Sequence, residues 1–252
     1  MKKKITIGLG ALMTAVALTL TACGGGSDSS QSGSENEQTL STYFNAFATN
    51  DATQMEPMLK AAEPGSPAEV YAKHQINTQV ANESANETDE PDVAEIDGDT
   101  VSLHPNFSDE ATDEEKKDAT TIYKDFVFSS NGLIETWTTE PGGLLTPRIS
   151  AQTGKATQGK VTVQLQTAYV TNSGDLYVTW SAKNSGGKAV DISVAGYVNS
   201  DGRQVQVTST PYQTKPISGS HTETSSTIEN GKLGGKLIFQ FDYQNQVSIT
   251  VK

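Results

Sequence analysis

The chain has 252 residues, with 30 Asp and Glu against 18 Lys and Arg, and a formal net charge of −12. It contains one cysteine, Cys23, so an intramolecular disulfide is excluded. The acidic residues are concentrated in one half: residues 24–140 hold 24 acidic and 5 basic side chains, and residues 141–252 hold 6 and 10. This asymmetry predicts two separate units, and the acidic unit should repel nucleic acid.

The first residues have the plan of an export signal. Lys2, Lys3 and Lys4 are followed by a mostly apolar run from Ile5 to Leu20 and by small residues. A retained transmembrane helix is the alternative, but it needs about 20 predominantly apolar residues, and this run is shorter. We therefore expect residues 1–22 to be a signal peptide.

Leu20-Thr21-Ala22-Cys23 resembles the lipobox of bacterial lipoproteins. The resemblance implies that a diacylglyceryl group, with palmitate-type acyl chains, is attached to the thiol of Cys23. Cleavage then leaves this cysteine as the first residue, and the protein is anchored through its lipid to the extracellular face of the cell membrane. The Gly- and Ser-rich stretch after Cys23 is more similar to Gram-positive surface lipoproteins. A free or buried cysteine is the alternative.

Three helices are expected after the anchor. Residues 23–37 are polar and rich in Gly and Ser, which favours a lipidated, disordered tether. Asp51 with Gln54 can cap a second, short helix, and Ser66 with Glu69 forms a capping-box pattern at the start of a third. The first helix is predicted by apolar residues at the spacing i, i+3, i+4 and i+7, namely Leu40, Tyr43, Phe44 and Phe47.

Antiparallel strands follow the helices. A hairpin is expected to turn at Asp97-Gly98-Asp99, and a second at Ser130-Asn131-Gly132, where the Asn-Gly pair suits a tight turn. The acidic stretch 105–118 between them is expected to be a loop. Helices followed by antiparallel strands indicate an α+β domain, which we place at residues 38–147.

This segment resembles the nuclear transport factor 2-like superfamily. The resemblance is carried by Tyr43-Phe44-Asn45-Ala46-Phe47, by Gly65-Ser66-Pro67-Ala68 and by Phe126-Val127-Phe128-Ser129. It implies a cone-like α+β fold, with three helices on a curved antiparallel sheet. Enzymes of the superfamily place a general acid or base inside the cone, and the candidates here are His74, Asp125 and Glu135.

The C-terminal half changes to strict alternation of apolar and polar residues. We expect a linker at residues 148–159 and about seven short strands in residues 160–252, which together indicate a β-sandwich. The stretch Leu176–Arg203 resembles the immunoglobulin-like domains of bacterial surface lipoproteins. Without a disulfide, the core of such a domain must depend on Trp180, Phe239 and Phe241.

The candidate site residues each have a simpler alternative. Tyr71, His74 and Trp137 could line one pocket, but packed aromatic side chains in or beside the core are the simpler explanation, which we favour. His74, His104 and His221 are far apart in sequence, so no metal site and no cofactor are expected. The acidic loops could bind calcium, yet neither has the spacing of a calcium-binding loop.

Two functions are compatible with these features. The first is a membrane-anchored extracellular lipoprotein that acts as a non-enzymatic module for an unknown protein or small-molecule ligand. The alternative is a small-molecule enzyme, of the isomerase or dehydratase type, that uses the interior of the α+β cone. An open interior with convergent polar groups would favour the enzyme, and a filled interior would leave the surface as the site.

Overall fold

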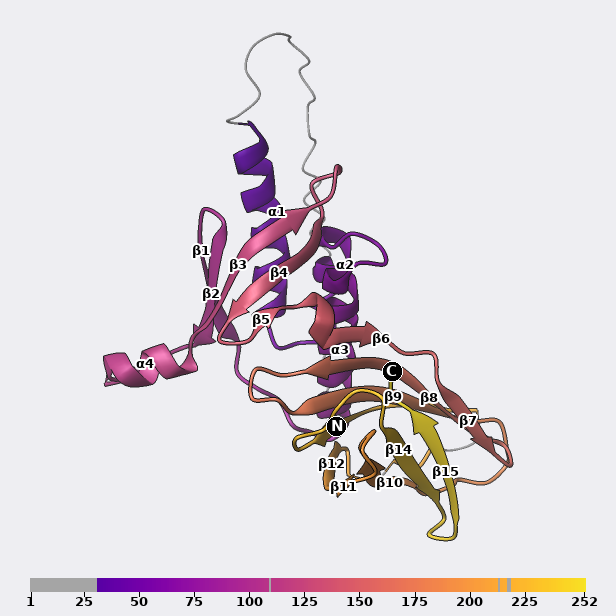
Figure 1. Ribbon diagram of the computed structural model, residues 1–252. Helices are drawn as coiled ribbons and strands as arrows, with labels where there is room; N and C mark the ends of the chain where they lie inside the picture. Colours follow the sequence, from indigo (N-terminus) through magenta and orange to yellow (C-terminus); the bar gives the residue numbers. More distant parts are fainter. Residues whose placement is uncertain (1–30, 109, 213, 217–218) are drawn as a thin grey trace, which may run out of the picture.

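The computed structural model describes residues 31–108, 110–212, 214–216 and 219–252 (Figure 1). The predicted signal peptide, Cys23 and the first part of the predicted tether lie outside these residues. The described chain is built mostly from antiparallel β-sheets, with few helices. A five-stranded sheet belongs to the N-terminal half, and a four-stranded and a six-stranded sheet form the C-terminal half.

The N-terminal half has three helices before its sheet. The strands follow one another as an antiparallel meander in the order β1-β2-β3-β4-β5, and α4 lies between β2 and β3. The elements are α1 (Gln31–Phe47), α2 (Pro57–Ala61), α3 (Pro67–Ser84), β1 (Asp92–Asp97), β2 (Thr100–Pro105), α4 (Asp113–Ala119), β3 (Thr121–Phe128), β4 (Ile134–Glu140) and β5 (Gly143–Leu144).

Helix α1 begins earlier than predicted. Residues 31–37, which were expected to belong to the tether, form its first two turns. The amphipathic turns from Leu40 onward are held by packing against the core. Extending this helix toward the N-terminus costs little free energy, because each added residue gains a backbone hydrogen bond. The hydroxyl groups of Thr39 and Thr42 also donate to the carbonyls of Glu35 and Gln38, one turn earlier.

The predicted start of α3 is confirmed. The Ser66 hydroxyl accepts a hydrogen bond from the amide of Glu69, and the carboxylate of Glu69 accepts one from the amide of Gly65. Asp51 caps a turn as expected, but α2 itself begins only at Pro57. Proline is well placed there, because its missing amide hydrogen would have no partner in the first turn.

Both predicted hairpins of the N-terminal sheet are confirmed. Asp97 pairs with Thr100 across the first turn, and Ile134 pairs with Phe128 across the second. The register of β3 against β4 shifts after Lys124, where Asp125 adopts a positive φ of 53°. This irregularity is a bulge, and it turns Phe126 toward the core.

The C-terminal half is a sandwich of two antiparallel sheets. The six-stranded sheet has the order β12-β13-β9-β8-β6 with β7 also paired to β8, and the four-stranded sheet has the order β11-β10-β14-β15. Their strands are β6 (Ile149–Ala151), β7 (Lys155–Gln158), β8 (Val161–Val170), β9 (Leu176–Asn184), β10 (Ile192–Val198), β11 (Gln204–Val205), β12 (Val207–Thr210), β13 (His221–Ile228), β14 (Lys236–Phe241) and β15 (Asn245–Thr250).

The predicted aromatic core of this sandwich is confirmed. Trp180, Phe239 and Phe241 are all buried between the two sheets. The rings of Trp180 and Phe239 meet edge to face, with centroids 4.9 Å apart. The Trp180 indole donates a hydrogen bond to the Ser226 hydroxyl at 2.9 Å, so its one polar group is satisfied in the core.

We expect Ser226→Ala to lower the free energy of unfolding by about 1–3 kcal/mol, because a buried donor is left without its acceptor. The Ser226 hydroxyl is buried and also bonds the Ser209 hydroxyl at 2.8 Å, so two partners lose their contact. Urea denaturation would measure the change. The exposed Ser248 is the matched control, and its replacement by alanine should stay within about 0.5 kcal/mol.

The segment 148–159 is not the linker that was predicted. Strand β6 pairs with the second half of β8, and β7 pairs with its first half. Between these strands, the buried side chain of Gln152 bonds the backbone of Lys252. The residues of this segment form strands at the side of the sheet, because pairing with β8 satisfies their backbone groups.

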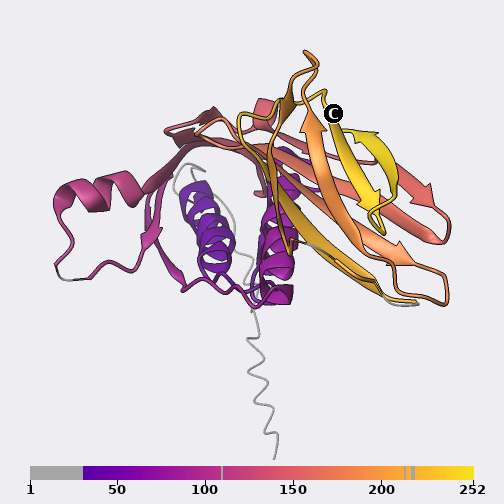
Figure 2. The ribbon, with the colours of Figure 1, turned by 90° about the horizontal axis from the view of Figure 1, so that it is seen from below.

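The two halves share part of one core. Ile149 and Tyr169 belong to the buried cluster of the N-terminal half, although they lie in β6 and β8. Helix α3 lies between α1 and the six-stranded sheet (Figure 2). The N-terminal and C-terminal halves are therefore held together by a packed helix and not by a flexible connection.

Candidate functional site

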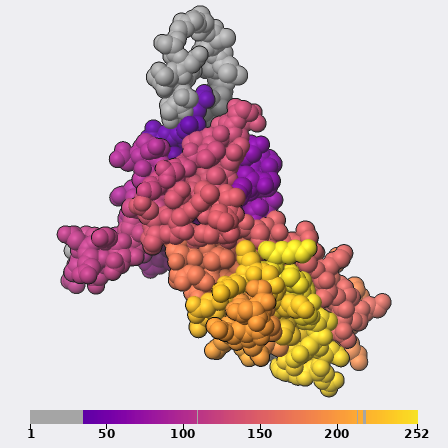
Figure 3. All heavy atoms as spheres, in the orientation of Figure 1, coloured from indigo at the N-terminus to yellow at the C-terminus, as the bar shows by residue number. Residues whose placement is uncertain are grey.

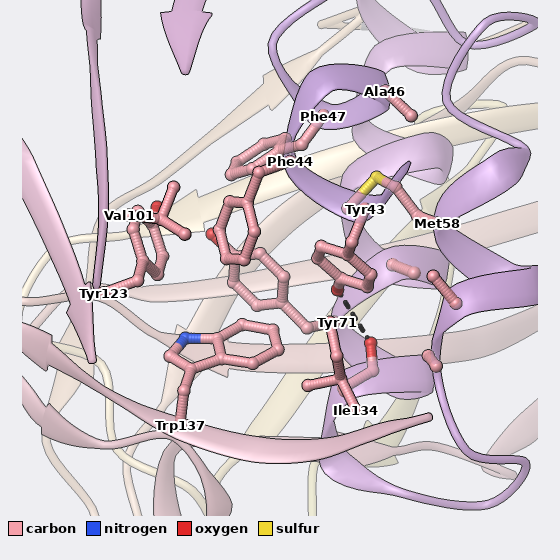
Figure 4. Close-up of a cluster of buried hydrophobic side chains, with 14 of the residues drawn as sticks. Tyr43, Phe44, Ala46, Phe47, Met58, Tyr71, Val101, Tyr123, Ile134 and Trp137 are labelled. Carbon is pink, nitrogen blue, oxygen red and sulfur yellow. Dashed lines mark hydrogen bonds between the residues drawn. The ribbon is translucent and has the colours of Figure 1, made fainter. Parts of the chain in front are cut away.

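The interior of the N-terminal half is filled by aromatic side chains (Figure 4). Phe44 lies at the centre, with its ring centroid 4.8 Å from that of Tyr123 and 5.9 Å from that of Trp137. The Tyr43 hydroxyl donates to the carbonyl of Ala68 at 2.9 Å. Burial raises the pKa of both Tyr43 and Tyr123, so these phenols stay protonated in this core.

Tyr71, His74 and Trp137, which could have lined a pocket, are packed within the protein. Their exposed fractions are 5%, 1% and 0%. The centroid of the Tyr71 ring lies 5.3 Å from that of Trp137 and 5.2 Å from that of Tyr169, and both contacts are edge to face. Aromatic contacts fill the space between them, so these three residues are a packed aromatic group and not the lining of a pocket.

His74 lies where α3 contacts the six-stranded sheet. Its Nδ1 is 2.8 Å from the Thr167 hydroxyl, which is 2.6 Å from the Thr179 hydroxyl. Burial lowers the pKa of His74 to about 3, because charging the imidazole would require solvation that the core does not provide. This histidine is neutral at physiological pH and is enclosed, so it cannot reach a substrate.

The acidic candidates for a general acid or base also lie away from the interior. Asp125 is exposed at the bulge of β3. Glu135 is half-buried at the start of β4, and its neighbour Ile134 points into the core instead. Neither carboxylate shares an enclosed space with His74.

A groove is present on the outer surface of the five-stranded sheet, beside α4. Its volume is about 640 Å³. Strands β1 and β2 form the floor of the groove, the segment after β2 forms one end, and α4 forms a wall. Helix α4 projects from the body of the molecule (Figures 1 and 3). The side chains that define its chemistry are Glu95, Ser102, His104, Phe107, Lys116 and Thr120.

The imidazole of His104 is held in one orientation in this groove. Its ring stacks on Phe107, with centroids 4.9 Å apart and planes 11° apart. Nδ1 lies 2.8 Å from the carbonyl oxygen of Pro105, which can only accept, so Nδ1 carries the hydrogen. The other nitrogen, Nε2, is 3.7 Å from the Glu95 carboxylate, which is longer than a hydrogen bond.

Helix α4 forms the wall of the groove without contributing to a core. It has no buried residue, and its start is fixed by a capping box. The Thr112 hydroxyl accepts a hydrogen bond from the amide of Glu115, and the Glu115 carboxylate accepts one from the amide of Thr112. Lys116 is half-exposed and lines the groove. Its ammonium makes no ion pair or hydrogen bond with any described residue, although the surrounding half of the chain is strongly acidic.

No motif in the sequence points to this groove. His104 was considered only as a possible metal ligand, and residues 105–118 were expected to be an acidic loop. The Thr112–Glu115 pattern is a capping-box signal that could have revealed α4. The seven-residue helix has no buried residue and lacks apolar periodicity, so the hydrophobic pattern of the sequence does not predict it.

Within residues 31–252, leaving out the undescribed positions, no group of three or more His, Cys, Asp or Glu side chains is arranged to hold a metal ion. The helices of the same part of the chain are too short or too polar to cross a membrane.

Comparison with known proteins gives no match. No family model, no curated protein and no solved structure matches this chain.

Proposed function

We propose that this protein is a membrane-anchored extracellular lipoprotein that acts as a non-enzymatic binding module. The lipid on Cys23 provides the anchor, and the groove beside α4 provides the binding site. The lipobox resemblance supports the anchor. We further propose that the N-terminal half is a nuclear transport factor 2-like domain and that the sandwich is an immunoglobulin-like domain, on the motifs that suggested both.

The observation that carries the binding function is the contrast between the interior and the surface. The space in which an isomerase or dehydratase would act is occupied by Phe44, Tyr71 and Trp137. The groove instead offers polar and charged side chains around a volume of about 640 Å³, within the usual range of about 300–1,000 Å³ for small-molecule sites. The surface groove is therefore the better candidate for a ligand.

The anchor makes a direct prediction about Cys23. Cys23→Ala should prevent lipidation, because no other thiol is present, and should leave the precursor unprocessed. Labelling of cells with a palmitate analogue, followed by detergent-phase partitioning, would measure both effects. Thr21→Ser is a suitable control because it retains the cysteine. Unchanged partitioning of the Cys23→Ala protein would contradict the anchor.

The binding site is tested by filling the groove. Residues 24–252 retain every described residue, and this chain can be screened by ligand-observed NMR against small peptides, saccharides, nucleotides and polyols. We expect at least one class to bind to the native chain and to lose binding in Ser102→Trp, which places an indole on the groove floor. A tryptophan at the exposed Thr157 of β7 is the control.

The two possible negative results both contradict the proposal. If no class of small molecule binds, the groove has no small-molecule ligand. If a ligand binds equally well to the native chain and to Ser102→Trp, its site lies elsewhere.

A further inference from the structure

The floor of the groove presents two hydrogen-bond acceptors side by side. When the ring of His104 is neutral, its Nε2 has a free lone pair, because Nδ1 carries the hydrogen and donates it to Pro105. The Glu95 carboxylate lies 3.7 Å away and is also an acceptor. Two acceptors cannot hydrogen-bond each other, so both are available to a group that brings several donors.

An ammonium group meets this requirement best. It carries three donors and a positive charge, and the charge complements Glu95 directly. The setting acts in the same direction, since residues 24–140 hold 24 acidic against 5 basic side chains. Such a field raises the local concentration of cationic groups near the groove.

The wall of the groove presents the opposite charge. The ammonium of Lys116 has no partner among the described residues, and the ordered helix α4 holds it at the groove. A lysine without a partner in an acidic half of the chain is available to a carboxylate. The hydroxyls of Ser102 and Thr120 and the ring of Phe107 complete the lining with polar and apolar contacts.

We propose that this groove binds an amphoteric small molecule, namely a free amino acid or a short peptide, with its ammonium at Glu95 and His104 and its carboxylate at Lys116. This assignment rests on the proposed binding function of the groove and adds the class of ligand. Helix α4 then has a clear role, because it contributes a ligand-binding lysine and no core residue.

The test removes one ligand charge at a time. The probes are L-alanyl-L-alanine, its N-acetyl form, its C-terminal amide, and glucose, each titrated into ¹⁵N-labelled chain 24–252. We expect the free dipeptide to shift groove resonances and the two blocked forms to bind about tenfold more weakly or worse, as loss of a charge-assisted hydrogen bond implies. Glucose should not bind.

Matched variants then assign each end of the ligand. Lys116→Gln should abolish the preference for the dipeptide over its amide while keeping the preference over the acetylated form. Glu95→Gln should have the converse effect. Lys117→Gln, at the neighbouring exposed position of α4, should change neither preference. A general disturbance of the groove would weaken all probes together and would not produce this crossed pattern.

Several results would overturn the assignment. One is equal binding of the free and blocked dipeptides. Another is the absence of shifts in the groove resonances at about 10 mM dipeptide, because this concentration would occupy most of a site even if the Kd were about 1 mM. If a saccharide, nucleotide or polyol binds in the groove and the dipeptide does not, the ligand class is wrong while the proposed binding function stands. If the groove binds nothing in either screen, both fail.

Discussion

Replacing Arg148 with alanine should lower the free energy of unfolding by about 3–5 kcal/mol. Arg148 is only 9% exposed and lies just before β6, at the junction of the two halves. No described carboxylate pairs with it, and its charge is stabilised by neutral acceptors and by the Tyr169 ring, whose centroid lies 5.1 Å from Cζ. Its guanidinium donates to four groups: the Val170 carbonyl, the Thr139 and Tyr169 hydroxyls and the Asn172 side-chain oxygen.

The size of this effect follows from the acceptors that remain. Alanine would leave Thr139 in β4 and Tyr169 in β8 without a shared donor, and a cavity would separate the two strands. Arg148→Lys keeps the charge but loses the planar fork, so it should fall between the native protein and the alanine variant. Urea denaturation measures both.

The exposed Arg203 provides the control for this prediction. Its alanine variant should stay within about 0.5 kcal/mol of the native protein. An Arg148→Ala protein as stable as the Arg203→Ala protein would show that the junction contributes little to folding.

Local signals in the sequence were sufficient for many elements of this fold. The Ser66–Glu69 capping box, the turn at Gly98 and the Asn131-Gly132 turn each depend on a few adjacent residues, and the structure has all three. The alternation around Trp180 likewise predicted which side chains enter the sandwich core. Such features can be predicted because the physical cause and the residues that express it lie close together in the chain.

The junction could not be predicted in the same way. The surface of the six-stranded sheet beneath α3 includes the buried hydroxyl residues Thr167 and Thr179. Thr179 alternates with apolar residues in the sequence, as solvent-facing positions do, and a register shift between Leu165 and Thr167 turns Thr167 to the same face of the sheet. Only the packing of α3 buries them. The strands within 148–159 were missed for a related reason, because their order comes from pairing with β8 and not from their own composition.

The candidate site was the least predictable part of the molecule. Glu95 and His104 come from paired strands, and Lys116 comes from a helix that was expected to be a loop. No short motif contains all three, so only the folded chain brings them to one groove. Tyr71 and Trp137 were easier to notice in the sequence, since large aromatic residues are conspicuous, but conspicuous residues of this kind are most often core.

Lowering the pH should destabilise the protein through His74. Burial lowers the pKa of this imidazole to about 3, whereas in the unfolded chain it is about 6.5. As the pH falls below about 6.5, the imidazole is protonated in the unfolded chain but stays neutral in the folded chain. The contribution of the neutral histidine to the free energy of unfolding is therefore complete above that pH and is lost progressively toward pH 3. Between pH 7 and pH 4 the loss should be about 3 kcal/mol.

A variant that does not titrate isolates this contribution. His74→Gln retains a side chain that can form a hydrogen bond with the Thr167 hydroxyl. Because glutamine does not titrate, the stability of this variant should depend less on pH. The carboxylates, including Glu223, whose pKa is raised by burial, are the same in both proteins. The measurement is the free energy of unfolding in urea at pH 7 and pH 4. Thr179→Ser is the control, because it changes the same hydrogen-bonded group without altering a titratable side chain and should keep the pH dependence of the native protein. Because His74 lies between α3 and the six-stranded sheet, the first contacts weakened by acid should be those that join the two halves. Equal losses of stability in the native and His74→Gln proteins would mean that the buried imidazole is solvated or protonated in the folded state.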